Sequence, residues 1–155
     1  MFQIGLISDT HGLLRPEALA FLQGCDHIVH AGDIGPAALL ETLARVAPLT
    51  VVRGNNDHGG SGDDLPETVR VMIDGIPFFV LHDLAKLDID AGARGVRVVV
   101  SDHSHQPRVE QRAGVLFVNP GSAGPRRFRL PVSVAELLVD DPSTVSARVV
   151  ELDFR

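Results

Sequence analysis

The sequence has one cysteine, no tryptophan and no tyrosine among its 155 residues. A lone cysteine, Cys25, excludes an internal disulfide and fits a reducing compartment, so we expect a cytoplasmic protein. Cys25 follows Gly24 at an expected joint between a helix and a strand, which favours an inert, half-buried thiol over a catalytic one. Because phenylalanine is the one large aromatic residue present, the core must be mainly aliphatic.

Long apolar runs and an excess of positive charge are also lacking. No apolar run approaches the roughly 18 residues of a membrane span, and no basic leader precedes the first strand-like segment, so we expect no membrane partner. The formal net charge of −6 argues against a stable nucleic-acid partner, because phosphate contacts dominate that kind of affinity. The sequence leaves open whether identical chains associate into a homo-oligomer.

The first third of the chain alternates strand-like and helix-like patterns. Strands are predicted at 2–8, 27–30 and 49–52, and helices at 15–24 and 36–45. Short loops between these segments are typical of parallel strands joined by helical crossovers. In such sheets ligands bind at the carboxyl ends of the strands.

The remainder of the chain is rich in strand patterns separated by turn signals. The predicted segments are hairpins of 69–73 with 77–81, 109–112 with 115–118 and 131–139 with 144–152, a strand at 96–100 and one short helix within 84–93. No internal repeat or linker interrupts the chain. We therefore predict a single domain over 1–155, with an α/β fold in which two sheets pack face to face and helices lie outside.

The apolar run Val98–Val100 is followed closely by two histidines, His103 and His105. In an extended segment, side chains two residues apart point the same way, so both imidazoles can face one small volume. Imidazole is a ligand for zinc, iron, nickel and similar ions. Taken alone, the pair fits a solvated His-Ser-His turn equally well. The other strand ends decide between the two interpretations.

Ligand-type side chains follow four further strand ends. The whole set is Asp9, His11, Asp33, Asn55, His82, His103 and His105. Seven nitrogen and oxygen ligands exceed what one four-coordinate ion needs, and they suit two ions that share a bridging carboxylate. No thiolate is among them, which argues against a structural zinc or iron–sulfur site. The donor types favour Mn, Fe, Zn, Co or Ni over Ca.

A charge count indicates the kind of substrate. Two divalent ions bring four positive charges, the two aspartates remove two, and a bridging hydroxide removes a third. One positive charge then remains in a cleft of an acidic protein, which favours an anion. Two ions about 3.5–4 Å apart can clamp the phosphoryl oxygens of a phosphate ester during in-line displacement.

Five ordered blocks carry a resemblance to a known family. They are Asp9-X-His11, Gly32-Asp33, Gly54-Asn55-X-Asp57, His82 and His103-X-His105. In this order, and over nearly the whole chain, they resemble the calcineurin-like metallophosphoesterase superfamily. The short length and Asn119-Pro120-Gly121-Ser122 further resemble its small bacterial and archaeal phosphodiesterases, which are related to the retromer scaffold subunit of eukaryotes. The resemblance implies a four-layer α/β/β/α sandwich of two mixed sheets flanked by helices.

The resemblance also implies a role for each ligand. Asp9, His11 and His105 would hold one metal, Asn55, His82 and His103 would hold the other, and Asp33 would bridge the two. The cofactors would be two divalent ions, with Mn as the first choice and Fe, Ni, Zn or Co as alternatives.

The activity that the resemblance implies is hydrolysis of a small phosphodiester. A metal-bridging hydroxide would be the nucleophile, with Asp33, Asn55 and His103 at the catalytic centre. Cyclic nucleotides, other nucleotide diesters and phospholipid head-group diesters all fit as substrates. The alternative is a non-catalytic scaffold or binding module on the same fold, like the retromer relative, whose metal site is degraded.

Three positions depart from the family pattern. Asn56 stands where the family usually has a histidine that assists the leaving group, and an amide cannot act as a general acid. His58, two residues further on, could substitute for that acid. Asp83 and Asp102 stand where glycine is usual. Asp102 could orient a ligand imidazole or could simply be solvated, and the second interpretation is favoured.

Three arginines and two further histidines complete the candidates. Arg126, Arg127 and Arg129 lie in a loop flanked by proline and glycine. A solvated cluster is the simplest interpretation, and contact with a substrate phosphate is the alternative. His30 lies inside a strand just before the second block, which predicts a hydrogen-bonded core histidine, and His27 is expected to be structural.

Overall fold

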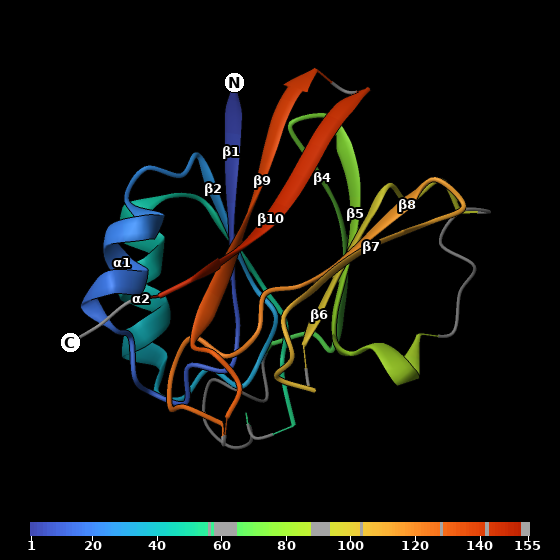
Figure 1. Cartoon of the computed structure of the whole chain (residues 1–155). Helices are drawn as coiled ribbons and strands as arrows, with labels where there is room; N and C mark the ends of the chain where they lie inside the picture. Colours follow the sequence, from blue (N-terminus) through green and yellow to red (C-terminus); the bar gives the residue numbers. More distant parts are fainter. Residues whose placement is uncertain are drawn as a thin grey trace.

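The computed structural model describes residues 1–55, 57, 65–87, 94–102, 104–127, 129–141 and 143–152. Within these ranges the chain forms two sheets of five strands each, two α-helices and a 3₁₀ helix (Figure 1). The elements are β1 (Phe2–Ile7), α1 (Pro16–Leu22), β2 (His27–His30), α2 (Ala37–Val46), β3 (Leu49–Val51), β4 (Thr68–Ile73), β5 (Ile76–Asp83), η2 (Leu84–Lys86), β6 (Val98–Asp102), β7 (Arg108–Arg112), β8 (Val115–Asn119), β9 (Ser133–Asp141) and β10 (Thr144–Glu151).

Both sheets are mixed, as the resemblance implied. The first has the order β10-β9-β1-β2-β3, in which β1, β2 and β3 are parallel and β9 pairs antiparallel with both β1 and β10. The second has the order β4-β5-β6-β8-β7, with β5, β6 and β8 parallel and an antiparallel strand at each edge. The carboxyl ends of these parallel strands meet at one edge of the sandwich, below the strands in Figure 1.

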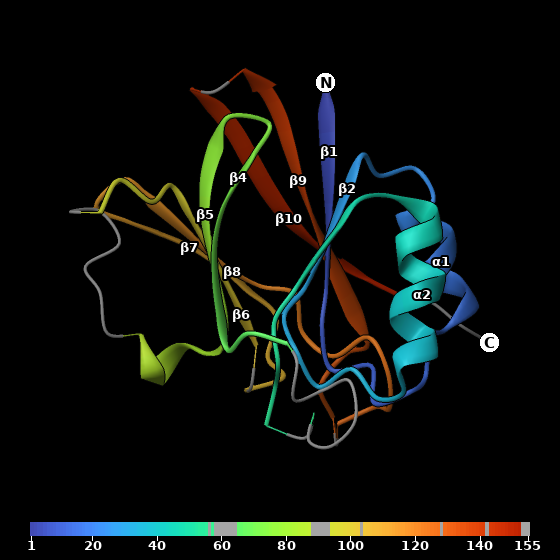
Figure 2. The same ribbon diagram turned by 180° about the vertical axis from the view of Figure 1, so that it is seen from behind.

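Apolar side chains hold the layers together. Leu6 and Val98 belong to the cluster between the two sheets. Leu22 of α1 and Leu43 of α2 are fully buried against the outer face of the first sheet, and the two helices lie side by side there (Figures 1 and 2). The second sheet covers the other face of the first. This arrangement confirms the predicted sandwich.

The outer face of the second sheet has a thinner cover than that of the first. Within the described ranges it carries the three-residue η2 and a cluster that includes Phe79, Val99 and Phe117. The short helix predicted within 84–93 corresponds to η2, and residues 88–93 lie outside the described part of the chain.

Local chemistry explains several element boundaries. α1 begins at Pro16, whose fixed φ and missing N–H suit the first helical turn. Both predicted two-residue turns are present, Asp74-Gly75 between β4 and β5 and Ala113-Gly114 between β7 and β8. Asp74 and Ala113 have φ values of 50° and 49°, the left-handed conformation that tight hairpins require.

The structure bears on two expectations, that of an inert Cys25 and that of a chain without a membrane span. Cys25 is buried next to α1, and burial raises the pKa of its thiol to about 11, so the thiol stays protonated and unreactive near neutral pH. Within the described ranges, none of the helices has the length and apolar character needed to cross a bilayer.

Candidate metal centre

Candidate ligands from both sheets meet at the carboxyl edge. Asp9 and His11 follow β1, Asp33 follows β2, Asn55 follows β3, His82 lies near the end of β5, and His105 follows β6. Four of these residues, Asp9, His11, Asp33 and His105, have φ values between 45° and 61°. Residues other than glycine rarely adopt this left-handed backbone conformation, and such backbone strain concentrates at functional sites.

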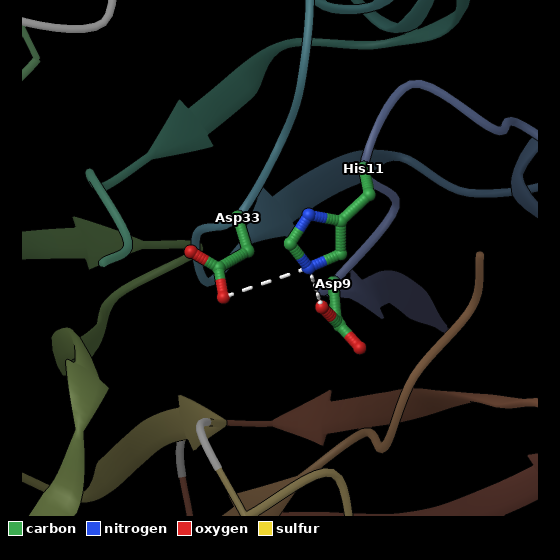
Figure 3. A group of neighbouring side chains, drawn as sticks. All are labelled: Asp9, His11 and Asp33. Atoms are coloured by element: carbon green, nitrogen blue, oxygen red, sulfur yellow. Dashed lines mark ion pairs between the residues drawn. The ribbon is translucent and has the colours of Figure 1, made fainter. Parts of the chain in front are cut away.

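His11 stands between two buried aspartates (Figure 3). Its Nε2 atom contacts Asp9 Oδ1 and lies 3.7 Å from Asp33 Oδ2. The backbone holds this geometry, because the His11 N–H donates to the Asp33 carbonyl and the Asp9 N–H donates to the Gly32 carbonyl, both at 3.0 Å. The loops after β1 and β2 thus place two carboxylates around one imidazole.

His82 brings the second sheet to the same point. Its Nδ1 lies 2.8 Å from the Ala31 carbonyl, which can only accept, so the proton sits on Nδ1 and the other ring nitrogen faces the cluster. Nε2 lies 3.2 Å from Asp33 Oδ2. Burial alone would lower the pKa of His82, but the hydrogen bond and charge of Asp33 raise it above its ordinary value. Asp33 therefore lies between imidazoles from the two sheets.

His105 faces Asp9 and one further carboxylate, that of Asp102. Its Nδ1 lies 2.9 Å from Asp9 Oδ2 and 3.8 Å from Asp102 Oδ2, and Asp102 and Asp9 raise the pKa of the imidazole. Asp102 is only 2% exposed, and its Oδ1 accepts the His105 backbone N–H at 3.2 Å. The interpretation of Asp102 as a solvated side chain is therefore wrong, because the end of β6 carries it into the interior. Asp83, the other departure from glycine, accepts the Ala85 N–H at the start of η2.

Asp9 has further partners from the loop before β9. The Arg127 guanidinium donates to both of its oxygens, each at 3.0 Å, and the Ser122 hydroxyl donates to Oδ2. Burial would raise the pKa of Asp9, but Arg127, Ser122 and the two nearby histidines hold it below its usual value. Arg126 and Arg129 are exposed, so the solvated interpretation holds for them and is wrong for Arg127.

Asp57 has a role that the sequence interpretation missed. Its carboxylate accepts the backbone N–H groups of Asp33, Ile34 and Gly54 at 2.8 Å each, and that of Gly35 at 3.4 Å. These bonds tie the end of β3 to the loop after β2. The sequence signal for this role is the position of Asp57 in the Gly54-Asn55-X-Asp57 block, to which no function was assigned.

The two remaining described histidines have structural roles, as predicted. His30 is fully buried, accepts the Gly32 N–H at Nδ1, and donates from Nε2 to Thr10, both at 3.1 Å. Burial lowers the pKa of His30 to about 4, so this imidazole is neutral. His27 lies 2.8 Å from the Thr50 hydroxyl, in a bond between β2 and the neighbouring β3.

Three candidate residues, His103, Asn56 and His58, lie outside the described part of the chain. Asn55 is exposed at the rim of a cleft of about 760 Å³ that His82 also lines. Phe79 and Leu81 supply an apolar wall to this cleft. Its charged lining is balanced, because Arg53 and Lys86 stand with Glu67 and Asp83, and Arg53 pairs with Glu67 at 2.6 Å.

The donor set fits divalent metal ions. Three buried ligand atoms, His11 Nε2, His105 Nδ1 and Asp102 Oδ2, lack a partner with hydrogen-bond geometry within the described ranges. There are two groups of ligand atoms, which share Asp9. Within each group all the ligand atoms lie within 4.8 Å of one another. One group is Asp9, His11 and Asp33, and the other is Asp9, Asp102 and His105. Buried polar atoms need partners, and an ion with imidazole and carboxylate ligands would supply them.

Comparison with known families agrees with this donor set. A family model described as the calcineurin-like phosphoesterase superfamily domain matches residues 2–141. The chain belongs to this superfamily. Together with the clusters of aspartate and histidine, this membership identifies a metal-dependent phosphoesterase and confirms the resemblance inferred from the ordered blocks.

Individual proteins are also similar to this chain. A probable metallophosphoesterase of Methanocaldococcus jannaschii is 33% identical over 152 residues, which cover 89% of this chain and 76% of that protein. The structure of an archaeal phosphodiesterase superposes with a TM-score of 0.79 at 22% identity, over 96% of this chain and 100% of that one. Vps29 of Entamoeba histolytica complexed with Zn²⁺ gives a TM-score of 0.73 at 21% identity, over 98% and 100% of the two chains. The two structural matches show the shared fold.

Proposed function

We propose that the chain hydrolyses phosphodiesters at a centre of two divalent metal ions. The ligands would be Asp9, His11, Asp33, Asn55, His82, His103 and His105. The observation that carries the proposal is the meeting of two buried carboxylates with imidazoles from both sheets, in which ring nitrogens are directed at carboxylate oxygens. His103 enters the proposal from its motif alone.

Asp33 is the carboxylate best suited to bridge two ions. Its Oδ2 lies 3.2 Å from His82 Nε2 and 3.7 Å from His11 Nε2, so it lies between ligands from different sheets. Asp9, His11 and His105 would hold the ion on one side, and Asn55, His82 and His103 the ion on the other. When bound, two such ions lower the pKa of water and neutralise phosphoryl oxygens. Mn is our first choice of metal, and the Zn²⁺ complex of Vps29 makes zinc the next to test.

The protein's own groups would orient the substrate. The exposed Asn55 amide can donate to a phosphoryl oxygen, and such donors stabilise charge that develops during reaction. Arg127 fixes Asp9 and adds a positive charge beside the ligands, which favours an anion. The adjoining cleft, with its apolar wall, has the size for one ester group of a small diester.

The preference for diesters follows from Asn56. An amide has no pKa in the useful range, and positioned acids contribute about a hundredfold to ten-thousandfold, so leaving groups that need a proton should depart slowly. A monoester dianion also carries one more negative charge, and Asn56 supplies no cation to neutralise it, as a protonated histidine at this position would. Aryl diesters should therefore react best, aryl monoesters poorly and alkyl monoesters hardly at all.

The test is a substrate panel with Mn²⁺, Ni²⁺, Zn²⁺ and Mg²⁺ added in turn. Bis-p-nitrophenyl phosphate should exceed p-nitrophenyl phosphate in kcat/KM, and Asn56→His should raise monoester activity without changing metal content. A wild type that already prefers the monoester contradicts the proposal. If Asn56→His gives no gain while His58→Ala abolishes activity, His58 is the acid.

The structural similarity to Vps29 makes a non-catalytic scaffold the second candidate. Diester hydrolysis by the metal-loaded chain, lost in Asp33→Asn, supports the enzyme. A chain that hydrolyses none of the panel with any of the four metals supports the scaffold.

A further inference from the structure

Asp102 is a buried carboxylate whose two oxygens have different surroundings. The residue ends β6 and is 2% exposed. Its Oδ1 accepts the His105 backbone N–H at 3.2 Å. Its Oδ2 has no hydrogen-bond partner within the described ranges. A buried carboxylate oxygen without a hydrogen bond is costly, so its retention in the interior calls for a compensating cation.

The groups around Oδ2 indicate what that cation is. His105 Nδ1 lies 3.8 Å away, too far for a hydrogen bond, and this nitrogen is itself buried without a hydrogen-bond partner among the described residues. The Arg127 guanidinium has both of its contacting nitrogens on Asp9. Asp9, Asp102 and His105 each offer a ligand atom, and the three atoms lie within 4.8 Å of one another.

We propose that Asp102 is an eighth metal ligand, which binds a divalent ion together with Asp9 and His105. The inference rests on the proposed metal-dependent function and adds a carboxylate to the ligand set that the family motifs supply. A third carboxylate lowers the charge of the loaded site by one, and the Arg127 guanidinium on Asp9 restores it. The donor set becomes richer in oxygen, which favours Mn²⁺ or Mg²⁺ over Ni²⁺ and Zn²⁺.

Asp102→Asn separates a ligand from a residue that merely positions His105. The variant keeps an Oδ1 acceptor for the His105 N–H and replaces the charged Oδ2 by an amide nitrogen, which cannot bind a cation. Asp102→Ala removes both functions. Asp140→Asn is the matched control, because it makes the same change at an exposed carboxylate near the end of β9.

The experiment is titration of each metal-free protein with Mn²⁺ and with Ni²⁺ in a calorimeter, without substrate. In Asp102→Asn we expect the Mn²⁺ affinity of one site to fall by about 10-fold to 100-fold and the Ni²⁺ affinity to fall less, with Asp140→Asn unchanged. If Asp102→Asn binds Mn²⁺ like the wild type and only Asp102→Ala is weakened, Asp102 positions His105 and the proposal is overturned.

Thermal unfolding gives a second test, because losing a metal ligand should affect the metal-free Tm and the gain in Tm on metal binding in different ways. Without metal, Asp102→Asn should have the same Tm as the wild type or a higher one, because it removes a buried charge that lacks a hydrogen bond at Oδ2 within the described ranges. Its gain in Tm on Mn²⁺ addition should be smaller. A lower metal-free Tm with an undiminished gain overturns the proposal. If the wild type hydrolyses diesters with Mn²⁺ while the Mn²⁺ affinity of Asp102→Asn is unchanged, the inference about Asp102 fails and the proposed function stands.

Discussion

The two edges of the sandwich use the left-handed backbone for different purposes. At the turn edge, Asp74 and Ala113 adopt it to reverse the chain, and a Cβ added to Gly75 or Gly114 would meet nothing within 4 Å. At the carboxyl edge, Asp9, His11, Asp33 and His105 adopt it where loops from different strands come together. There, a Cβ on Gly54 would collide with the Asp33 backbone nitrogen and carboxylate.

This difference shows what each edge demands of the sequence. The turn edge needs only a reversal and leaves its side chains in solvent. The carboxyl edge needs close approach of backbones, because ligands on short loops must converge within a few ångströms. Substitutions at matched residue types should therefore have unequal effects on the two edges.

The largest contrast is expected between Gly54→Ala and Gly75→Ala. The methyl group of Gly54→Ala displaces Asp33, and a displacement of about 1 Å can cost about a hundredfold in rate, so kcat/KM for the diester should fall by at least that factor. Gly75→Ala meets open space and should keep full activity. It should lose only about 1 kcal/mol of stability from its φ of +79°.

Steady-state kinetics and urea unfolding of the two variants measure this contrast. Similar activities in the two variants would remove the distinction between the edges.

The variants Asp57→Asn and Asp74→Asn make the same change at one aspartate of each edge, and their free energies of unfolding should differ. The Asp57 carboxylate accepts four backbone N–H groups, whereas an amide oxygen can accept two, so at least one buried donor loses its partner. The expected loss is about 2 kcal/mol of unfolding free energy, together with weaker metal binding. Asp74→Asn changes an exposed side chain at a turn that also accommodates asparagine, and it should be neutral.

Chemical denaturation gives both free energies of unfolding. The account of Asp57 fails if its substitution is as neutral as that of Asp74.

A third expected effect concerns His30, which lies under the carboxyl edge, and it appears only as the pH falls. Burial outweighs the nearby carboxylates of Asp57, Asp33 and Asp9 and lowers the pKa of His30 to about 4. As the pH falls below about 6.5, His30 becomes protonated in the unfolded chain but stays neutral in the folded chain. The contribution of the neutral His30 to stability is therefore full above pH 6.5 and is lost towards pH 4.

Urea unfolding of metal-free wild type and His30→Gln at pH 7 and pH 5 tests this effect. The wild type should lose about 2 kcal/mol more between the two pH values than the variant does. Equal losses would mean that His30 titrates normally.

The sequence predicted the parts of the site that depend on chain order. Strand ends, turn residues and the order of the ligand blocks are local signals, and they identified Asp9, His11, Asp33, His82 and His105 as neighbours before any distance was known. The two-residue turns were predicted for the same reason, since Asp-Gly and Ala-Gly satisfy the hairpin geometry locally.

The sequence could not predict contacts between distant segments. Arg127 reaches Asp9 across 118 positions, and Asp57 accepts donors 22 to 24 residues earlier in the chain. Asp102 looked solvated because a carboxylate beside a turn usually is, and only the packing of the two sheets buries it. These contacts depend on how the loops pack, which hydrophobic periodicity does not encode.

The number of ions bound per chain tests the central claim most directly. Protein freed of metal, reconstituted with Mn²⁺ and desalted should contain about two equivalents of Mn by elemental analysis, and Asp33→Asn should contain less than one, because it loses the bridging carboxylate. A natively folded wild type that retains no Mn, Zn, Ni or Fe after the same treatment would contradict the account.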